Sequence, residues 1–394
     1  MKTQKPSCKS FVCRNVAELP PSGIRKFFDL VATMEGAISL GVGEPDFVTP
    51  WHIREAAIYS IEKGYTMYTS NSGTPELRTA VSAYLEGRYN VNYDPVGEIL
   101  ITTGVSEGLD LVMRAVLNPG DEVIMPDPCY VSYPACVCLA GGKVVRVPTR
   151  VEDGFELRAE NIEPYITVKT RAILLGYPAN PTGAMIKRDK LVKIAEMAKH
   201  HGLLVISDEI YARLVYGVDE VCYASIPGVK ETTVLLGGFS KAYAMTGWRL
   251  GYACGNTEII GAMTKIHQYT MLCAPIMAQK AAVEALKNGN LSVNEMVEDY
   301  NRRRVLMVKG FNNIGLKCFE PRGAFYVFPS IQSTGMTSEE FAEKLLKKEK
   351  VVVVPGTAFG PSGEGYIRCC YATALTEIEE ALGRIQHFLK KQAK

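Results

Sequence analysis

Residues Gly237–Tyr252, GGFSKAYAMTGWRLGY, place one lysine directly after an apolar run and an arginine eight residues further on. Small residues around Lys241 leave room for a bulky group beside its amine. Ser240 and Arg249 are the donors that a phosphate needs. A lysine beside a phosphate site is what a Schiff-base cofactor requires. On spacing alone, an exposed lysine after a strand is equally compatible, but the phosphate loop of nucleotide hydrolases is excluded because no G-x-x-x-x-G-K-[ST] occurs.

The composition limits the class of protein. A chain of 394 residues with 47% hydrophobic content can bury a large core, and we expect two domains. A net charge of +2 argues against nucleic acid as the main partner. No apolar run approaches the roughly 20 residues of a membrane span, and no signal peptide is recognisable, so we expect no membrane partner and a cytoplasmic location. The 11 scattered cysteines favour reduced thiols, and no ligand spacing indicates a metal site.

Helical and strand patterns alternate from about residue 75 onward. Helices are predicted at 107–117 and 190–201, and Leu77, Val81 and Leu85 recur at helical spacing. The predicted strands, apolar on both faces, are 98–102, 122–125, 143–147, 172–176, 203–207 and 234–237. This alternation predicts an α/β fold with a mostly parallel sheet covered by helices.

Polar or aromatic groups follow five of the predicted strands. Ligands of open α/β sheets bind beyond the carboxyl ends of the strands, so these groups predict one shared site. In chain order they are Gly104-Val105-Ser106, Pro128-Cys129-Tyr130, Asn180, Asp208 to Tyr211, and Ser240-Lys241.

The pattern changes after about residue 285. Helices are predicted at 292–312, 338–348 and 376–390, and strands at 324–328, 351–355 and 366–372, which indicates a smaller α+β domain. The run Arg302-Arg303-Arg304 favours a solvated helix face over a phosphate site.

Further motifs occur in order along the chain. Besides the Lys241 segment, they are SLGVGEPDF at Ser39–Phe47, NPTG at Asn180–Gly183, SDEIY at Ser207–Tyr211 and GYIR at Gly365–Arg368. Together they resemble the class I/II aminotransferases, fold-type I enzymes that use pyridoxal 5′-phosphate (PLP), from about Pro20 to the C-terminus. The opening PSGIR at 21–25 resembles an archaeal and bacterial branch that includes aspartate and aromatic aminotransferases.

The resemblance implies a fold and a reaction. The fold is a mostly parallel seven-stranded sheet in a large PLP-binding domain, residues 47–285, with a small α+β domain built from residues 1–46 and 286–394. The reaction moves the amino group of an L-amino acid, of the aspartate or aromatic type, to a 2-oxo acid, usually 2-oxoglutarate, in two ping-pong half-reactions.

The resemblance also assigns residues to the cofactor ring. Lys241 would form the Schiff base and carry a proton at the substrate α-carbon. Asp208 would pair with the pyridine nitrogen and so make the ring an electron sink. Tyr211 and Asn180 would donate to the phenolate oxygen, and Tyr130 would stack on the ring.

The cofactor phosphate has its own expected partners. Gly104, Val105 and Ser106 would offer backbone N–H groups at a helix N-terminus, and Ser240 and Arg249 would complete the cup. Tyr68 matches a residue that reaches the phosphate from the neighbouring subunit in relatives, which implies a homodimer with shared active sites.

For the substrate, Arg368 would hold the α-carboxylate in two parallel hydrogen bonds, with Gly43 and Asn180 beside it. No residue securely matches a cation for a distal carboxylate, although Ser22, Ile24 and Tyr269 are candidates for that end of the pocket. Aspartate, aromatic and alanine-like donors therefore stay open.

Two other functions are compatible with parts of this pattern. A PLP-dependent C–S lyase or synthase on the same fold keeps Lys241, Asp208 and Arg368, so these residues do not discriminate. A regulator that uses this fold as a sensor carries a DNA-binding domain ahead of it, and only about twenty residues precede the match here.

Overall fold

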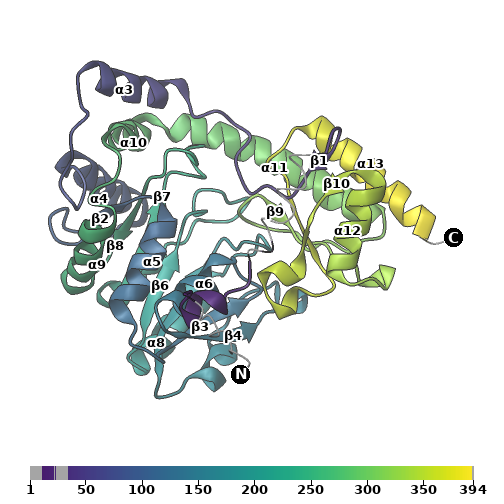
Figure 1. The fold of residues 1–394 in the computed structure, drawn as a ribbon, viewed down its shortest axis with the longest axis horizontal. Helices are drawn as coiled ribbons and strands as arrows, with labels where there is room; N and C mark the ends of the chain where they lie inside the picture. The colour runs from purple at the N-terminus through teal and green to yellow at the C-terminus, as the bar shows by residue number, and fades with distance from the viewer. Residues whose placement is uncertain (1–10, 22, 24–33, 393–394) are drawn as a thin grey trace, which may run out of the picture.

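A computed structural model describes residues 11–21, 23 and 34–392. Its centre is a seven-stranded sheet with the order β2-β8-β7-β6-β5-β3-β4 (Figure 1). β8 runs in the direction opposite to the other six strands, which confirms the mostly parallel α/β fold. The strands are β2 (Ile99–Thr102), β3 (Glu122–Asp127), β4 (Lys143–Pro148), β5 (Thr170–Gly176), β6 (Leu204–Asp208), β7 (Thr233–Gly238) and β8 (Gly251–Cys254).

Helices cover both faces of this sheet because its strands are apolar on both sides. Leu174 packs with the cluster under α5, α6 and α9, whereas Ile173 and Leu175 pack with the cluster under α7 and α8. The helices of this part are α3 (Trp51–Glu62), α4 (Pro75–Tyr89), α5 (Val105–Val116), α6 (Ser132–Leu139), α7 (Ala159–Ile162), α8 (Arg188–His200), α9 (Thr257–Thr270) and α10 (Ile276–Asn288). A short helix, α1 (Arg14–Ala17), precedes them.

Local sequence signals explain where several helices begin. Thr74 accepts from the N–H of Leu77, and Pro75 occupies the first turn of α4, where its missing N–H is not needed. Asn256 caps α9 in the same way, through the N–H of Ile259.

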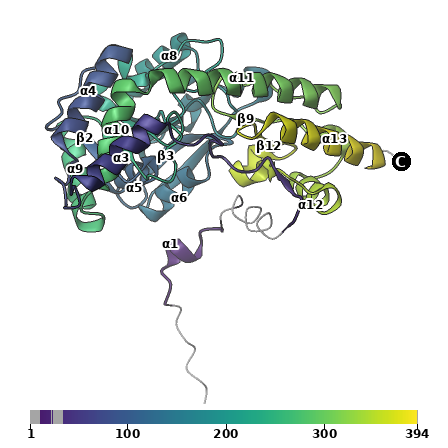
Figure 2. The same ribbon diagram turned by 90° about the horizontal axis from the view of Figure 1, so that it is seen from above.

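The rest of the chain folds beside the sheet, at the right of Figure 1. Helix α11 (Asn290–Asn313) runs from the sheet part to α13 (Leu375–Gln392), as Figure 2 shows, and α12 (Ser338–Glu349) packs against α13. One small sheet has the order β11-β12-β9 and the other pairs β1 with β10 in parallel. These strands are β1 (Ile38–Ser39), β9 (Tyr326–Val327), β10 (Val351–Val352), β11 (Val354–Pro355) and β12 (Ile367–Cys370).

Two strand predictions change in the structure. The run 351–355, predicted as one strand, divides into β10 and β11, which belong to different sheets because Val351–Val352 pair with β1 while Val354–Pro355 pair with β12. Strand β8, which is four residues long, was not predicted, and its antiparallel direction depends on pairing with both β2 and β7.

The prediction for the arginine run on α11 was wrong at two of its three positions. Arg303 is only 7% exposed: Nη1 lies 2.7 Å from Asp46 Oδ2 and donates to the carbonyl of Thr373. Arg304 is also buried and pairs with Glu320. Of the run, only Arg302 is mainly solvated. Arg303 therefore ties the segment after β1 to the C-terminal half of the chain.

Arg303→Ala should lower the free energy of unfolding by on the order of 2 kcal/mol, because it leaves Asp46 unpaired; the partial exposure of Asp46 keeps the loss below that of a fully buried pair. Thermal unfolding followed by circular dichroism should show a midpoint several degrees below wild type. The matched control is Arg302→Ala, which removes the same charge from an exposed side chain. Equal shifts in the two variants would contradict this account.

Candidate active site

A cavity of about 600 Å³ opens beyond the carboxyl ends of the parallel strands. All five predicted strand ends contribute to it, so the structure brings together groups from β2, β3, β5, β6 and β7. The predicted site residues that line it are Gly43, Val105, Ser106, Tyr130, Asn180, Asp208, Tyr211, Ser240, Lys241, Arg249 and Arg368.

Lys241 lies just beyond β7, and its amine points into the cavity. Its Nζ donates to the carbonyl oxygen of Gly43 at 2.7 Å, and the ring centroids of Tyr211 and Phe325 lie 5.9 and 5.7 Å away. Burial lowers the pKa of Lys241 to about 8, because the low-dielectric surroundings penalise the ammonium. The two nearby arginines, Arg368 and Arg249, act in the same direction. Lys241 is thus an amine of which about a tenth is neutral at pH 7 and about half at pH 8.

Asp208 ends the neighbouring strand, β6. Its Oδ2 accepts from the hydroxyl of Tyr133 at 2.8 Å, and its Oδ1 accepts from the N–H of Ile210. Burial raises the pKa of Asp208 to about 6, while these two hydrogen bonds favour the carboxylate. Asp208 is therefore ionised at pH 7.

Tyr133, on α6, was missed by the sequence analysis. Its hydroxyl passes so close to β5 that a Cβ on Gly176 would lie 2.2 Å from it, so only glycine fits there. The signal available in the sequence was an aromatic three residues after Tyr130, but its direction depends on how α6 sits on the sheet.

Arg368 is almost fully buried on β12, with 2% of its surface exposed. Its Nη1 donates to Asn180 Oδ1 at 3.0 Å, and its Nη2 donates to the carbonyl of Gly41. The guanidinium packs over the rings of Tyr326 and Phe359, whose centroids are 4.5 and 4.9 Å from its central carbon. These contacts hold a planar cation rigidly at the wall of the cavity.

Tyr326 on β9 is a second residue that sequence reasoning did not find. Its hydroxyl lies 2.8 Å from that of Tyr211, and burial raises the pKa of both phenols. A Cβ on Gly43 would stand 2.3 Å from the Tyr326 hydroxyl, so Tyr326 explains why a glycine occupies that position.

The end of the cavity that is expected to hold a phosphate lies at the N-terminus of α5. Gly104 adopts φ +80°, and its N–H donates to the carbonyl of Thr102 at 2.8 Å, so it is not the free donor that the sequence suggested. Val105 and Ser106, the first residues of α5, have no acceptor within the helix. A Cβ on Gly104 would lie 2.8 Å from Nη2 of Arg249, so this glycine lets the guanidinium approach the helix end.

The remaining predicted site residues are not found among the residues that line this cavity. Tyr68 and Tyr269 are 83% and 84% exposed, and neither lines the cavity of its own chain. Ser22 and Ile24 lie outside the described residues.

The arrangement fits a phosphorylated aromatic aldehyde. A partly neutral lysine amine would bind the aldehyde, an ionised aspartate faces the same cavity, and unpaired N–H groups at a helix N-terminus stand beside an arginine. This combination defines a lysine-dependent PLP enzyme.

The comparisons with known proteins agree with that class. Residues 35–385 match the family described as aminotransferase class I and II, and the chain belongs to this family of PLP-dependent enzymes. It is 55% identical over 382 residues to YugH of Bacillus subtilis (strain 168), provisionally named an aminotransferase, covering 97% of this chain and 99% of YugH. It is 45% identical to the aspartate aminotransferase of Pyrococcus abyssi, covering 94% and 96%. The solved aromatic aminotransferase of Pyrococcus horikoshii OT3 superposes with a TM-score of 0.90 at 43% identity, covering 94% and 99%.

The low pKa of Lys241 predicts selective reactivity in the cofactor-free enzyme. Acetylation of its amine by acetic anhydride should increase with pH around a midpoint of about 8, because only the neutral amine attacks and the anhydride itself does not titrate. Peptide mass spectrometry at each pH gives the extent of modification, with exposed lysines of α8 and α12 as internal references. Saturating PLP should protect Lys241. A midpoint above pH 10 would contradict a desolvated amine.

Proposed function

We propose that this aminotransferase accepts an L-amino acid of the aspartate or aromatic type and passes its amino group to 2-oxoglutarate in two ping-pong half-reactions. The observation that carries the proposal is one cavity that combines the Lys241 amine, the Asp208 carboxylate and the Arg368 guanidinium. Relatives named for aspartate and for aromatic amino acids support both donor types.

PLP, when bound, supplies an aldehyde that condenses with amines and a ring that withdraws electrons from the substrate α-carbon. Asp208, ionised at neutral pH, would hold a proton on the ring nitrogen, and Tyr133 would keep the carboxylate aimed at it. Asn180 and Tyr211 would face the phenolate oxygen, and Tyr130 would stack on the ring.

Lys241 would have two successive roles. Its amine would hold the cofactor aldehyde in the resting enzyme and, once displaced by substrate, remove the proton from the α-carbon. A pKa of about 8 suits a base that must be partly neutral at physiological pH.

The substrate carboxylate would bind Arg368, with the backbone of Gly43 beside it. Arg368 already donates to Asn180 and Gly41, so its orientation is set before substrate arrives. Amino acid and 2-oxo acid share this carboxylate, so one clamp serves both half-reactions.

We also propose that residues 47–285 form the large domain and that residues 1–46 and 286–394 form the small one. The parallel pairing of β1 with β10 supports this division, since it joins the two ends of the chain.

Tyr68 would reach the cofactor phosphate of a second subunit, consistent with its exposure here, and mass measurement in solution would report such a homodimer.

Among the described residues, no helix combines the length and apolarity needed to cross a lipid bilayer. The free thiols of the ten described cysteines support a reducing, cytoplasmic location.

A panel of donors tests the reaction. Incubation with 2-oxoglutarate and either aspartate, phenylalanine, tyrosine or alanine should yield glutamate in proportion to the 2-oxo acid formed from the donor, as measured by chromatography. A C–S lyase would instead release a 2-oxo acid and ammonia from a sulfur-containing amino acid without any acceptor. That result, with no glutamate formed, would replace the proposal by the alternative.

Arg368→Lys should weaken every donor and acceptor alike, because lysine keeps the charge but loses the bidentate fork. The expected loss in kcat/KM corresponds to about 2–4 kcal/mol of transition-state binding. PLP affinity should change little, since Ser240 and Arg249 lie at the phosphate end. A loss confined to acidic donors would move Arg368 to the side-chain pocket.

A further inference from the structure

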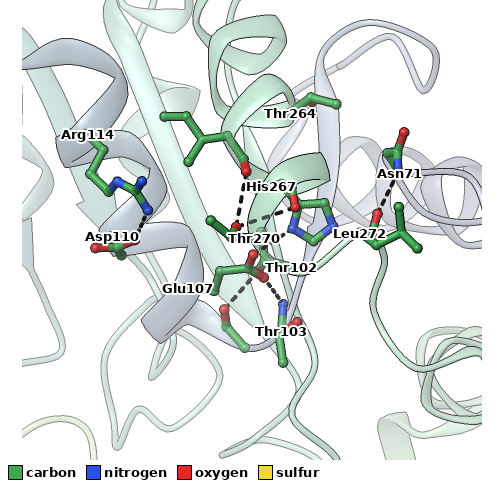
Figure 3. A network of polar contacts seen from close by, with 12 residues as sticks. Asn71, Thr102, Thr103, Glu107, Asp110, Arg114, Thr264, His267, Thr270 and Leu272 are labelled. Atoms are coloured by element: carbon green, nitrogen blue, oxygen red, sulfur yellow. Dashed lines mark hydrogen bonds and ion pairs between the residues drawn. The ribbon is translucent and has the colours of Figure 1, made fainter.

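A buried carboxylate and a buried imidazole contact each other next to the first turn of α5, and neither residue lines the active-site cavity (Figure 3). Glu107 stands in the first turn of α5, and His267 in the last turn of α9. Glu107 Oε1 is 2.6 Å from His267 Nδ1, and the two side chains are 8% and 0% exposed. With Glu107 ionised, its oxygens only accept, so Nδ1 carries the hydrogen of this bond.

The second oxygen of Glu107 accepts from the backbone N–H of Thr103. Thr102 adds a hydrogen bond from its hydroxyl to the carbonyl of Gly104 at 2.9 Å. The turn that enters α5 is thus held by bonds that use none of the groups of Val105 or Ser106. Those two N–H groups stay available at the cavity, in an orientation that Glu107 helps to fix.

His267 gives Glu107 a rigid partner. The backbone carbonyl of His267 accepts from the N–H groups of Met271 and Leu272. The carbonyl of Leu272 in turn accepts from the side-chain amide of Asn71 at 2.7 Å (Figure 3). The Nε2 atom is buried with no hydrogen-bond partner among the described residues. Burying a polar atom without a hydrogen-bond partner costs free energy, so packing alone does not explain why a histidine occupies this position. The hydrogen bond of His267 with Glu107 does explain it.

We propose that Glu107 and His267 are a positioning pair for the cofactor phosphate. The inference rests on the proposed function, in which the α5 N-terminus and Arg249 bind that phosphate. The pair acts by holding the Thr103–Gly104 peptide, not by touching the cofactor. By charge alone, a carboxylate this close would repel a phosphate dianion, so removing it would tighten binding. Positioning predicts the opposite sign.

The experiment compares PLP with pyridoxal, which has the aldehyde but no phosphate. Dissociation constants for the cofactor-free protein are measured from the absorbance of the lysine-bound chromophore. Glu107→Ala should weaken PLP by about tenfold or more and leave pyridoxal unchanged, since only the phosphate cup is disturbed. Glu107→Gln should stay near wild type, because its amide oxygen can accept from Thr103 and its amide nitrogen can donate to Nδ1 once the imidazole hydrogen moves to Nε2.

Asp110→Ala is the matched control for charge. It removes a carboxylate from the same helix, but the ion pair that Asp110 makes is a largely exposed one, with Arg114 at 3.3 Å (Figure 3). Its PLP affinity should equal that of wild type. His267→Leu should reproduce the effect of Glu107→Ala, and His267→Asn should restore affinity because its amide can donate near the position of Nδ1. This second pair of variants carries the test if Glu107→Ala does not fold.

Three outcomes would overturn the role of the pair: tighter PLP binding in Glu107→Ala, equal losses for PLP and pyridoxal, or His267→Leu indistinguishable from wild type. Failure of the proposed function looks different. Wild-type protein would then bind PLP no more tightly than pyridoxal, or borohydride would trap the cofactor on a lysine other than Lys241. Either result would reject the phosphate site itself and, with it, the role of Glu107 and His267.

Discussion

The parallel pairing of β6 with β7 is the constraint on which the active site depends. Asp208 is in register with Leu236, so β6 ends in its carboxylate while β7 continues into the Ser240–Lys241 turn. Neighbouring strands lie about 4.8 Å apart, which brings the acid and the amine to one edge of the sheet. A slip of one residue would turn Asp208 to the opposite face. The buried apolar faces of both strands fix that register.

Burial then sets the chemistry of these groups in opposite directions. It disfavours charge on both, so it raises the pKa of Asp208 to about 6 and lowers that of Lys241 to about 8, which leaves Asp208 mainly ionised and Lys241 partly neutral near physiological pH. Arg368 cannot respond in this way, because a guanidinium does not lose its proton. It is instead compensated by Asn180, the Gly41 carbonyl and two aromatic faces. Each charge in the cavity thus carries its own fixed partners.

The sheet alone supplies only part of the cavity wall. Gly43 comes from the segment after β1, and Arg368 and Tyr326 come from the C-terminal strands. The pairing of β1 with β10 and the Arg303–Asp46 ion pair hold these segments together. Contacts far from Lys241 in sequence therefore decide whether a carboxylate clamp exists beside it.

Residues near one another in the chain made much of this protein predictable. Alternating helical and strand patterns indicated the parallel sheet, and five polar strand ends indicated the cavity, because parallel strands bring their carboxyl ends to one edge. The sequence did not indicate Tyr133, Tyr326 or the Glu107–His267 contact, and it suggested a solvated Arg303 and Arg304. These residues matter through partners on other elements: Asp208, Tyr211, the Thr103 peptide, Asp46 and Glu320. Local patterns report the face and the type of an element, whereas side-chain partners are decided only when helices and strands distant in the chain pack together.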